Sequence, residues 1–169
     1  RFSVGQTRAH MPPNGLASRM AWAAPRRLPS PIRRMNEGTS MLVGQAVAQA
    51  VATFGPLTTL VNNAGIFHPG GVETETEEGW ARMIRVNQTG VFYGMKAAVP
   101  ELLKSGNAAI VNISSLYGLI GSPDALSYHA SKAAVRVMGK GTALEFARRG
   151  IRVNTIFPGQ IRTPILGDI

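Results

Sequence analysis

The pair of residues best suited to chemistry in this 169-residue sequence is Tyr128 and Lys132, which lie four positions apart. In a helix this spacing places both side chains on one face. A free tyrosine ionises near pH ~10, which is too high for proton transfer at neutral pH. A neighbouring ammonium group and a helix N-terminus both favour the phenolate, so the pair predicts a tyrosine with a lowered pKa that acts as an acid or base. The alternative is an ordinary pair on a solvated helix face.

Asn87 stands out because periodicity places it on the apolar face of a predicted helix, between Ile84 and Val91. A buried amide without partners costs about 1–3 kcal/mol. Asn87 therefore either bonds neighbouring backbone in a structural role or also holds a water in a proton path. Ser114 and Ser115, which end a predicted strand, could bind a substrate oxygen or cap a loop. The sequence has no G-x-S-x-G motif, which argues against a serine hydrolase.

The elements that must position these residues are strands and helices in alternation. Predicted helices cover residues 41–53, residues 127–149 and a segment that begins with a capping box of Thr74 and Glu77 and runs to Leu102. Predicted strands cover residues 57–62, 108–114 and 151–157. This alternation predicts an α/β fold, a Rossmann-like, doubly wound parallel sheet with helices on both faces. Such sheets bind ligands at the carboxyl ends of their strands, here residues 62–65, 114–115 and 158–163.

Composition narrows the class of protein further. Apolar residues make up 44% of the chain, enough for a core, and no run approaches the ~18 apolar residues of a membrane span. The absence of cysteine excludes disulfides, thiolate metal sites and cysteine nucleophiles, and we expect no metal site. A chain without cysteine is compatible with a reducing compartment, so we expect a cytoplasmic protein with no membrane partner.

The net charge of +9 is concentrated in residues 1–40, which hold seven arginines and one acidic residue. Five prolines interrupt every helix that could form there, so we expect this head to be disordered, vestigial or non-native. Its acid-poor composition resembles a transit peptide, although the prolines do not suit the amphipathic helix of such a peptide. An arginine-rich head could also bind nucleic acid. The chain shows no nucleic-acid-binding module, so we do not expect that partner.

Five motifs in order resemble the classical short-chain dehydrogenase/reductase family. They are Asn62-Asn63-Ala64-Gly65, Asn87 within residues 85–90, Ile110-Val-Asn-Ile-Ser-Ser115, Tyr128-x-x-x-Lys132 and Pro158-Gly159-x-Ile161-x-Thr163. Each motif is weak alone, whereas the ordered set across residues 41–169 is specific. The resemblance implies a Rossmann-type domain and an NAD- or NADP-dependent oxidoreductase that interconverts a secondary alcohol and a ketone.

The resemblance also implies a role for each site residue. Tyr128 would be the catalytic acid/base, Lys132 would lower its pKa and bind the nicotinamide ribose, and Ser115 would orient the substrate oxygen. Asn87 would complete the catalytic set by holding a proton-relay water. Besides Tyr128 and Lys132, the residues that would bind the cofactor are Asn63, Ala64, Gly65, Pro158, Gly159, Ile161 and Thr163.

The sequence also departs from the family pattern. No G-x-x-x-G-x-G phosphate turn occurs in residues 1–40, and the residue that would choose between NAD and NADP is missing with it. Thr58 stands where the family often has Asp, and further substrate-loop helices and a last strand are expected beyond Ile169. We therefore expect a partial domain that binds the cofactor weakly. The alternative function is a binding protein that has lost turnover.

Two surfaces are expected to meet partners. Tyr117, Leu119 and Ile120 could form an apolar wall, which favours a hydrophobic alcohol, ketone or steroid-like substrate. One face of the predicted helix 127–149 carries mostly small residues, which permit close packing on its own sheet or, as the resemblance implies, against a second subunit of a homo-oligomer. The residues of this face are Ala130, Ala134, Val137, Gly141 and Leu144.

Overall fold

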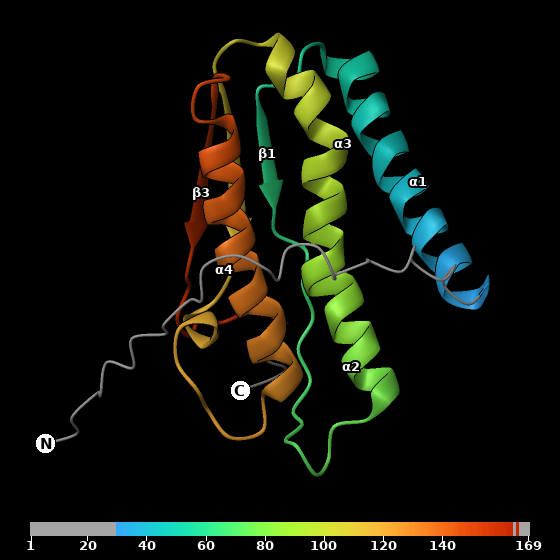
Figure 1. Cartoon of the computed structure of the whole chain (residues 1–169), viewed down its shortest axis with the longest axis vertical. Coiled ribbons are helices and arrows are strands. Elements are labelled where there is room, and N and C mark those ends of the chain that lie inside the picture. Colours follow the sequence, from blue (N-terminus) through green and yellow to red (C-terminus); the bar gives the residue numbers. More distant parts are fainter. Residues whose placement is uncertain (1–29, 164, 166–169) are drawn as a thin grey trace, which may run out of the picture.

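Three parallel strands form the centre of the structure. The computed structural model describes the backbone of residues 30–163 and 165 and the side chains of these residues from 38 onward. The strands β1 (Thr59–Asn62), β2 (Ala108–Ile113) and β3 (Ile151–Ile156) pair in that order, and both pairings are parallel (Figure 1). The parallel α/β sheet that the sequence predicts is thus confirmed.

Helices form both crossovers between these strands. α2 (Glu77–Ile84), a π-helical turn η1 (Arg85–Thr89) and α3 (Gly90–Lys104) follow one another between β1 and β2. A 3₁₀ turn η2 (Leu116–Gly118) and α4 (Leu126–Phe146) lie between β2 and β3. Within the described residues, no helix combines the length and the hydropathy that crossing a membrane requires.

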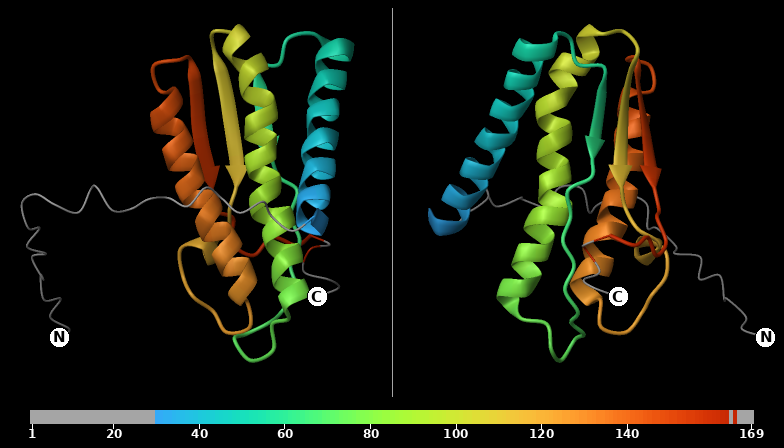
Figure 2. Two further views of the ribbon diagram at one scale, coloured as in Figure 1. Left: turned by 45° about the vertical axis from the view of Figure 1, so that its right-hand side comes forward. Right: turned by 180° about the vertical axis from the view of Figure 1, so that it is seen from behind.

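The helices of the described residues lie on one face of the sheet (Figure 2). Ile110 on that face is fully buried, whereas Val61 and Ile156 on the opposite face are 55% and 49% exposed. Two successive right-handed crossovers that run in the same direction along a sheet place both helices on the same side. The expected cover of helices on both faces is therefore not completed within this part of the chain.

The apolar core lies where α3 and α4 meet the amino-terminal half of the sheet. Leu102, Ile110 and Val135 are fully buried there, and Phe146 and Ile151 belong to the same cluster. Full burial of a side chain of this size contributes about 1.5–3 kcal/mol to stability. Burial of these side chains therefore stabilises the packing of both crossovers on the sheet.

The helix α1 (Ser30–Phe54) packs against α3 and begins earlier than residue 41, where the sequence predicts its start (Figure 1). Pro31 lies in its first turn, where a missing N–H removes no helical hydrogen bond. The prediction that prolines prevent a helix in residues 1–40 is therefore wrong for residues 30–40, and residues 1–29 lie outside the described part. The helix ends as predicted before Gly55, whose φ of 86° suits glycine.

Thr76, not Thr74, caps the helix α2. The Thr76 hydroxyl accepts a hydrogen bond from the backbone N–H of Gly79 at 2.9 Å. The Thr74 hydroxyl instead accepts from the N–H of Gly71 at 2.9 Å, within the preceding loop. The predicted capping box of Thr74 and Glu77 is therefore wrong, because the turn before the helix already uses the first of the two threonines.

The π-helical turn η1 changes which side of the helix faces the core. The N–H of Gly90 donates to the carbonyl oxygen of Arg85, five residues earlier. Such a turn holds one residue more than an α-helical turn and therefore rotates the preceding helix about its axis. Trp80, which the sequence places on the apolar face, is 40% exposed, and one turn later Met83 is fully buried where the sequence places Ile84.

Candidate active site

The residues predicted to do chemistry lie at the carboxyl-terminal edge of the sheet, the lower edge in Figure 1. Because the three strands are parallel, the segments that follow them, which contain Asn63, Ser115 and Pro158, leave the sheet at the same edge. The first turn of α4 and the loop between β1 and α2 lie there too (Figures 1 and 2). The topology thus brings together parts of the chain that are far apart in sequence.

Tyr128, Lys132 and Ser115 form one group at this edge. The amino nitrogen of Lys132 lies 5.6 Å from the centre of the Tyr128 ring, one helical turn away on α4. The Ser115 hydroxyl is near enough to the Tyr128 hydroxyl to favour its ionised form. Phe67 packs edge-on against Tyr128, with ring centres 5.2 Å apart. Ser114 is not part of the group, because its hydroxyl donates to the carbonyl oxygen of Lys132 at 2.8 Å.

Burial, rather than the neighbouring cation, dominates the ionisation of Tyr128 and Lys132. Desolvation raises the pKa of Tyr128 above its ordinary value, and the hydrogen bond with Ser115 opposes this rise. Lys132 is 3% exposed, and desolvation lowers its pKa to about 8. The lowered pKa predicted for Tyr128 is therefore not found. The loss of water around the phenolate outweighs an ammonium group whose own charge is disfavoured by burial.

Asn87 is fully buried, as the helical periodicity predicts. Its side-chain oxygen accepts from the N–H of Ile66 and its side-chain nitrogen donates to the carbonyl oxygen of Ile66, both at 2.8 Å. The same nitrogen lies 3.3 Å from the hydroxyl of Ser131 and 3.0 Å from the sulfur of Met83. Asn87 thus joins η1 to the segment after β1 and to α4. Its role as holder of a proton-relay water stays a prediction.

Polar groups of three elements converge beside Gly65. The amino group of Lys132 donates to the carbonyl oxygen of Ile113, the last residue of β2, at 3.0 Å. A Cβ atom placed on Gly65 would lie 3.4 Å from both the Lys132 nitrogen and the Asn87 side-chain oxygen. The backbone that leaves β1 therefore runs directly beside the buried amine.

The loop between β1 and α2 is fastened to the start of α4. The backbone of Gly70 forms a parallel bridge with that of Ala125, which directly precedes α4. The carboxylate of Glu75, on a side chain that is 6% exposed, binds Ser127 in the first turn of α4 and lies 3.0 Å from His68. The hydrogen bond from Ser127, followed by the contacts with His68, lowers the pKa of Glu75. These contacts hold the first turn of α4, which carries Tyr128, against the loop between β1 and α2.

The residues predicted to bind a nicotinamide cofactor lie along the same edge, in the segments that follow β1 and β3. Each is exposed or half-buried: Asn63, Ala64, Gly65, Pro158, Gly159, Ile161 and Thr163. The carbonyl oxygen of Pro158 accepts from the N–H of Leu116 at 2.9 Å, which ties the segment after β3 to the segment after β2. A nucleotide along this edge would meet accessible backbone and the Tyr128 hydroxyl, so the residues present fit such a ligand.

Sequence patterns did not single out Ser131 and Glu75, which both support the site. The Ser131 hydroxyl donates to the carbonyl oxygen of Tyr128 at 2.8 Å and lies 3.3 Å from the Asn87 amide nitrogen. A stripe of buried residues every four positions along α4 could have identified this face: Ser127, Ser131, Val135 and Gly139. Glu75 carries no comparable signal, because nothing local distinguishes it from the other glutamates of its loop.

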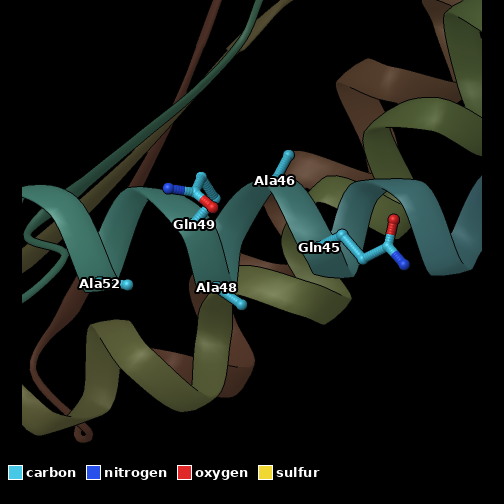
Figure 3. Close-up of a pocket in the computed structure, with 5 residues that line it drawn as sticks. All are labelled: Gln45, Ala46, Ala48, Gln49 and Ala52. Carbon is cyan, nitrogen blue, oxygen red and sulfur yellow. The ribbon is translucent and has the colours of Figure 1, made fainter.

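A hollow of about 640 Å³ on α1 lies apart from this site (Figure 3). Its lining consists of small and amide side chains: Gln45, Ala46, Ala48, Gln49 and Ala52. None of these side chains titrates near neutral pH or acts as a nucleophile. The hollow therefore offers no chemistry that competes with the edge of the sheet.

Comparisons with known proteins match this geometry to one family. A model of the short chain dehydrogenase family matches residues 36–169. The chain is 59% identical over 124 residues to the 2,5-dichloro-2,5-cyclohexadiene-1,4-diol dehydrogenase LinX of Sphingobium indicum, covering 73% of this chain and 50% of that protein. It is 46% identical over 126 residues to the cyclohexanol dehydrogenase of an Acinetobacter species, covering 73% and 49%.

Solved structures agree with the sequence matches. The structure of ElxO with NADP bound superposes with a TM-score of 0.70 and 39% identity, covering 73% of this chain and 50% of that one. The chain spans about half the length of the curated relatives it matches. With the family match extending over residues 36–169 and the same architecture in a solved relative, the chain belongs to the short-chain dehydrogenase family.

Proposed function

We propose that this chain carries the proton-transfer site of an NAD- or NADP-dependent oxidoreductase that interconverts a secondary alcohol and a ketone. The observation that carries the proposal is the grouping of three side chains: the amino group of Lys132 lies 5.6 Å from the Tyr128 ring, and the Ser115 hydroxyl acts on the ionisation of Tyr128. The NADP in the ElxO structure supports the cofactor class. The names of the two dehydrogenases supply the precedent for an alcohol substrate.

Tyr128 is the group that exchanges a proton with the substrate oxygen. During oxidation the phenolate of Tyr128 accepts the proton of the alcohol, and during reduction the phenol returns a proton to the ketone oxygen. A bound nicotinamide supplies or removes the hydride. Because burial raises the pKa of Tyr128, the phenolate needs a second group to stabilise it, and the hydroxyl of Ser115 and the ammonium of Lys132 are the groups at hand.

Lys132 and Asn87 support this proton exchange. With a pKa of about 8, the amine of Lys132 can release and take up a proton near neutral pH. Asn87 keeps the segment after β1 against α4 through its bonds to Ile66 and Ser131. We also propose that Asn87 binds a water molecule that relays the proton. The cofactor would lie between the segment with Asn63, Ala64 and Gly65 and the segment with Pro158, Gly159, Ile161 and Thr163.

We infer that the substrate is an apolar, ring-containing alcohol. Leu119 and Ile120 follow Ser115 by a few residues and are 45% and 52% exposed, so they are available to pack against a hydrocarbon ring. The two relatives are named for a cyclohexadiene diol and for cyclohexanol, which supports the same class.

Replacement of Tyr128 by phenylalanine tests the proposed chemistry. Tyr128→Phe should lower kcat for the oxidation of cyclohexanol by about 10²- to 10⁴-fold, because the proton acceptor is lost. Binding of NADP, measured by calorimetry, should change by less than about threefold, since the ring remains. Turnover is followed by the absorbance of the reduced nicotinamide.

Tyr93→Phe is the matched control, because Tyr93 lies half-buried on α3 outside the site, and it should retain the activity of the parent chain. Unchanged turnover in Tyr128→Phe would remove the proposal. A parent chain that binds NADP and oxidises no alcohol would favour the alternative of a binding protein.

We also propose that α4 forms a contact between subunits. On its outer face Val137 and Leu144 are 65% and 82% exposed, and Gly141 between them is exposed as well. Large apolar side chains beside a glycine permit close packing of a second helix. Val137→Glu should convert an oligomer to monomers in light scattering, whereas the same change at Val72, which is 83% exposed on a loop, should not. A parent chain that is already monomeric would contradict this contact.

A further inference from the structure

His129 binds the backbone of the segment that follows Ser115. Its Nδ1 atom lies 2.7 Å from the carbonyl oxygen of Tyr117. Its Nε2 atom lies 3.0 Å from the backbone nitrogen and 3.1 Å from the carbonyl oxygen of Ser122. One imidazole ring on α4 therefore holds both ends of residues 117–122.

These contacts determine the tautomer of the neutral ring. A carbonyl oxygen only accepts hydrogen bonds, so Nδ1 must carry the proton that is donated to Tyr117. Nε2 of the neutral ring is then an acceptor and receives the N–H of Ser122. The Tyr117 ring also packs against the imidazole, with ring centres 4.9 Å apart. A side chain without both nitrogens cannot hold both ends of the segment.

The segment that His129 holds is joined to the candidate active site. The Ser115 hydroxyl accepts the N–H of Tyr117 at 3.1 Å, so the two residues share one turn. A Cβ atom placed on Gly118 would come within 2.9 Å of the carbonyl group of Lys132, which shows how closely the segment lies on α4. The backbone of residues 117–122 is therefore held beside Ser115 and against α4.

The same segment presents apolar side chains to solvent. Leu116, Leu119 and Ile120 are 40%, 45% and 52% exposed. Ligand sites for apolar molecules combine such side chains with a few hydrogen-bonding groups that fix orientation, and the Ser115 hydroxyl is a group of that kind. The position of these side chains relative to the hydroxyl depends on the backbone that His129 holds.

We propose that His129 is a positioning residue that sets the preference of this site for ring-containing over small alcohols. It touches no reacting atom and acts through the backbone of Tyr117 and Ser122. Without its hydrogen bonds, the wall formed by residues 116–120 can move while the tyrosine and lysine on α4 stay in place. The inference rests on the proposed function, because selectivity is measured as turnover.

The tautomer is tested by nitrogen-15 NMR of the full chain labelled at histidine. The chain has three histidines, and the spectrum of His129→Phe assigns the signals of His129. In the neutral ring we expect a protonated Nδ1 and an unprotonated Nε2. A ring protonated at Nε2 would leave the Ser122 N–H without its acceptor and would overturn the proposal.

Selectivity is tested with the variant His129→Phe, which keeps a ring beside Tyr117 and lacks both nitrogens. The ratio of kcat/KM for cyclohexanol to that for propan-2-ol should fall about tenfold, through a higher KM for cyclohexanol, because two hydrogen bonds are lost. The kcat for propan-2-ol should stay within about threefold of the parent value. His129→Asn, whose amide can still donate to Tyr117, should give an intermediate ratio. An unchanged ratio in His129→Phe overturns the proposal.

Ser122→Ala is the matched control, because His129 binds the backbone of Ser122 and not its hydroxyl. Its selectivity ratio should equal that of the parent chain. A fall as large as that of His129→Phe would assign the effect to the serine side chain and would overturn the role of the histidine.

Hydrogen exchange of the Ser122 amide distinguishes a failure of this inference from a failure of the proposed function. Exchange should become about tenfold faster in His129→Phe, because the N–H loses its acceptor, and should not change in His68→Phe. If the parent chain oxidises neither alcohol, the proposed function fails. Faster exchange would then still support the role of His129 in holding the segment, and unchanged exchange would overturn it.

Discussion

The two ends of the helical layer differ in what they bury. Near the amino-terminal ends of the strands, α3 and α4 bury apolar side chains such as Leu102, Val135 and Phe146. Near the carboxyl-terminal ends, the same helices and the segment before α3 bury polar groups, among them Asn87 and Lys132. Every buried side-chain nitrogen and oxygen atom in the described part of the chain has a hydrogen-bond partner.

Stability and chemistry are therefore separated along one pair of helices. Apolar burial stabilises the fold without any need for exact partners. A buried amine or amide is stabilising only while its partners stay in place, and it otherwise costs free energy. The apolar end can therefore hold the helices in register for the polar end, whose residues carry the proposed chemistry.

A cavity in the apolar end should destabilise the protein more than any other change considered below. Leu102→Ala removes a fully buried side chain from the centre of the core and should lower the free energy of unfolding by about 3 kcal/mol. Chemical denaturation measures this loss. Val72→Ala, at a loop position that is 83% exposed, should cost less than about 0.5 kcal/mol, and an equal loss at both positions would contradict the separation of core and surface.

Replacement of the buried Lys132 at the polar end should raise the free energy of unfolding instead of lowering it. Lys132→Met removes a buried charge at the cost of one hydrogen bond to Ile113, so the variant should be more stable than the parent by about 2 kcal/mol near neutral pH. Turnover should be lost at the same time. A variant that is less stable and still active would show that the lysine serves the fold rather than the reaction.

The pH dependence of the free energy of unfolding gives a second test of the buried charge on Lys132. Burial lowers the pKa of Lys132 from 10.5 to about 8, so between these values the unfolded chain binds more protons than the folded chain. The lysine therefore makes the stability of the parent rise with pH across this window. Lys132→Met should lack that rise, whereas Lys140→Met, at an exposed position of α4, should keep it. Urea denaturation at a series of pH values measures the difference.

The smallest effect concerns the cap of α2, at the polar end. Thr76→Ala should lower the free energy of unfolding by about 1 kcal/mol, because the N–H of Gly79 loses its acceptor. Thr74→Ala should cost less, since its hydroxyl serves a turn in an exposed loop. Thermal unfolding of the two variants ranks the positions, and a larger loss at Thr74 would support the capping box that the sequence predicts.

The sheet and the candidate site were predictable to different degrees. The three apolar runs predict the strands because parallel strands in this fold are nearly continuous in hydrophobicity, and their order along the chain then predicts the edge where ligands bind. Asn87 was predictable because a single polar residue interrupts an apolar face. The start of α1 was not, because prolines suggest a break wherever they fall and Pro31 happens to lie in a first turn.

Ionisation was the least predictable property. Spacing shows that Tyr128 and Lys132 share a helix face, yet the pKa of each is governed by how deeply the side chain is buried. Burial comes from Phe67, Gly65 and other residues that are distant in sequence from both. The support from Glu75 and His129 is missed for the same reason, because each acts through contacts with another segment.

Because of the π-helical turn, the orientation of the preceding helix depends on a single extra residue. Deletion of one residue within η1, such as Gln88, would restore the regular repeat and rotate everything before it by roughly 100° relative to α3. Asn87 would then lose its hydrogen bonds to Ile66, whereas the apolar residues of α3 would keep their place in the core. A single deletion would in this way remove the link between the helix and the segment after β1.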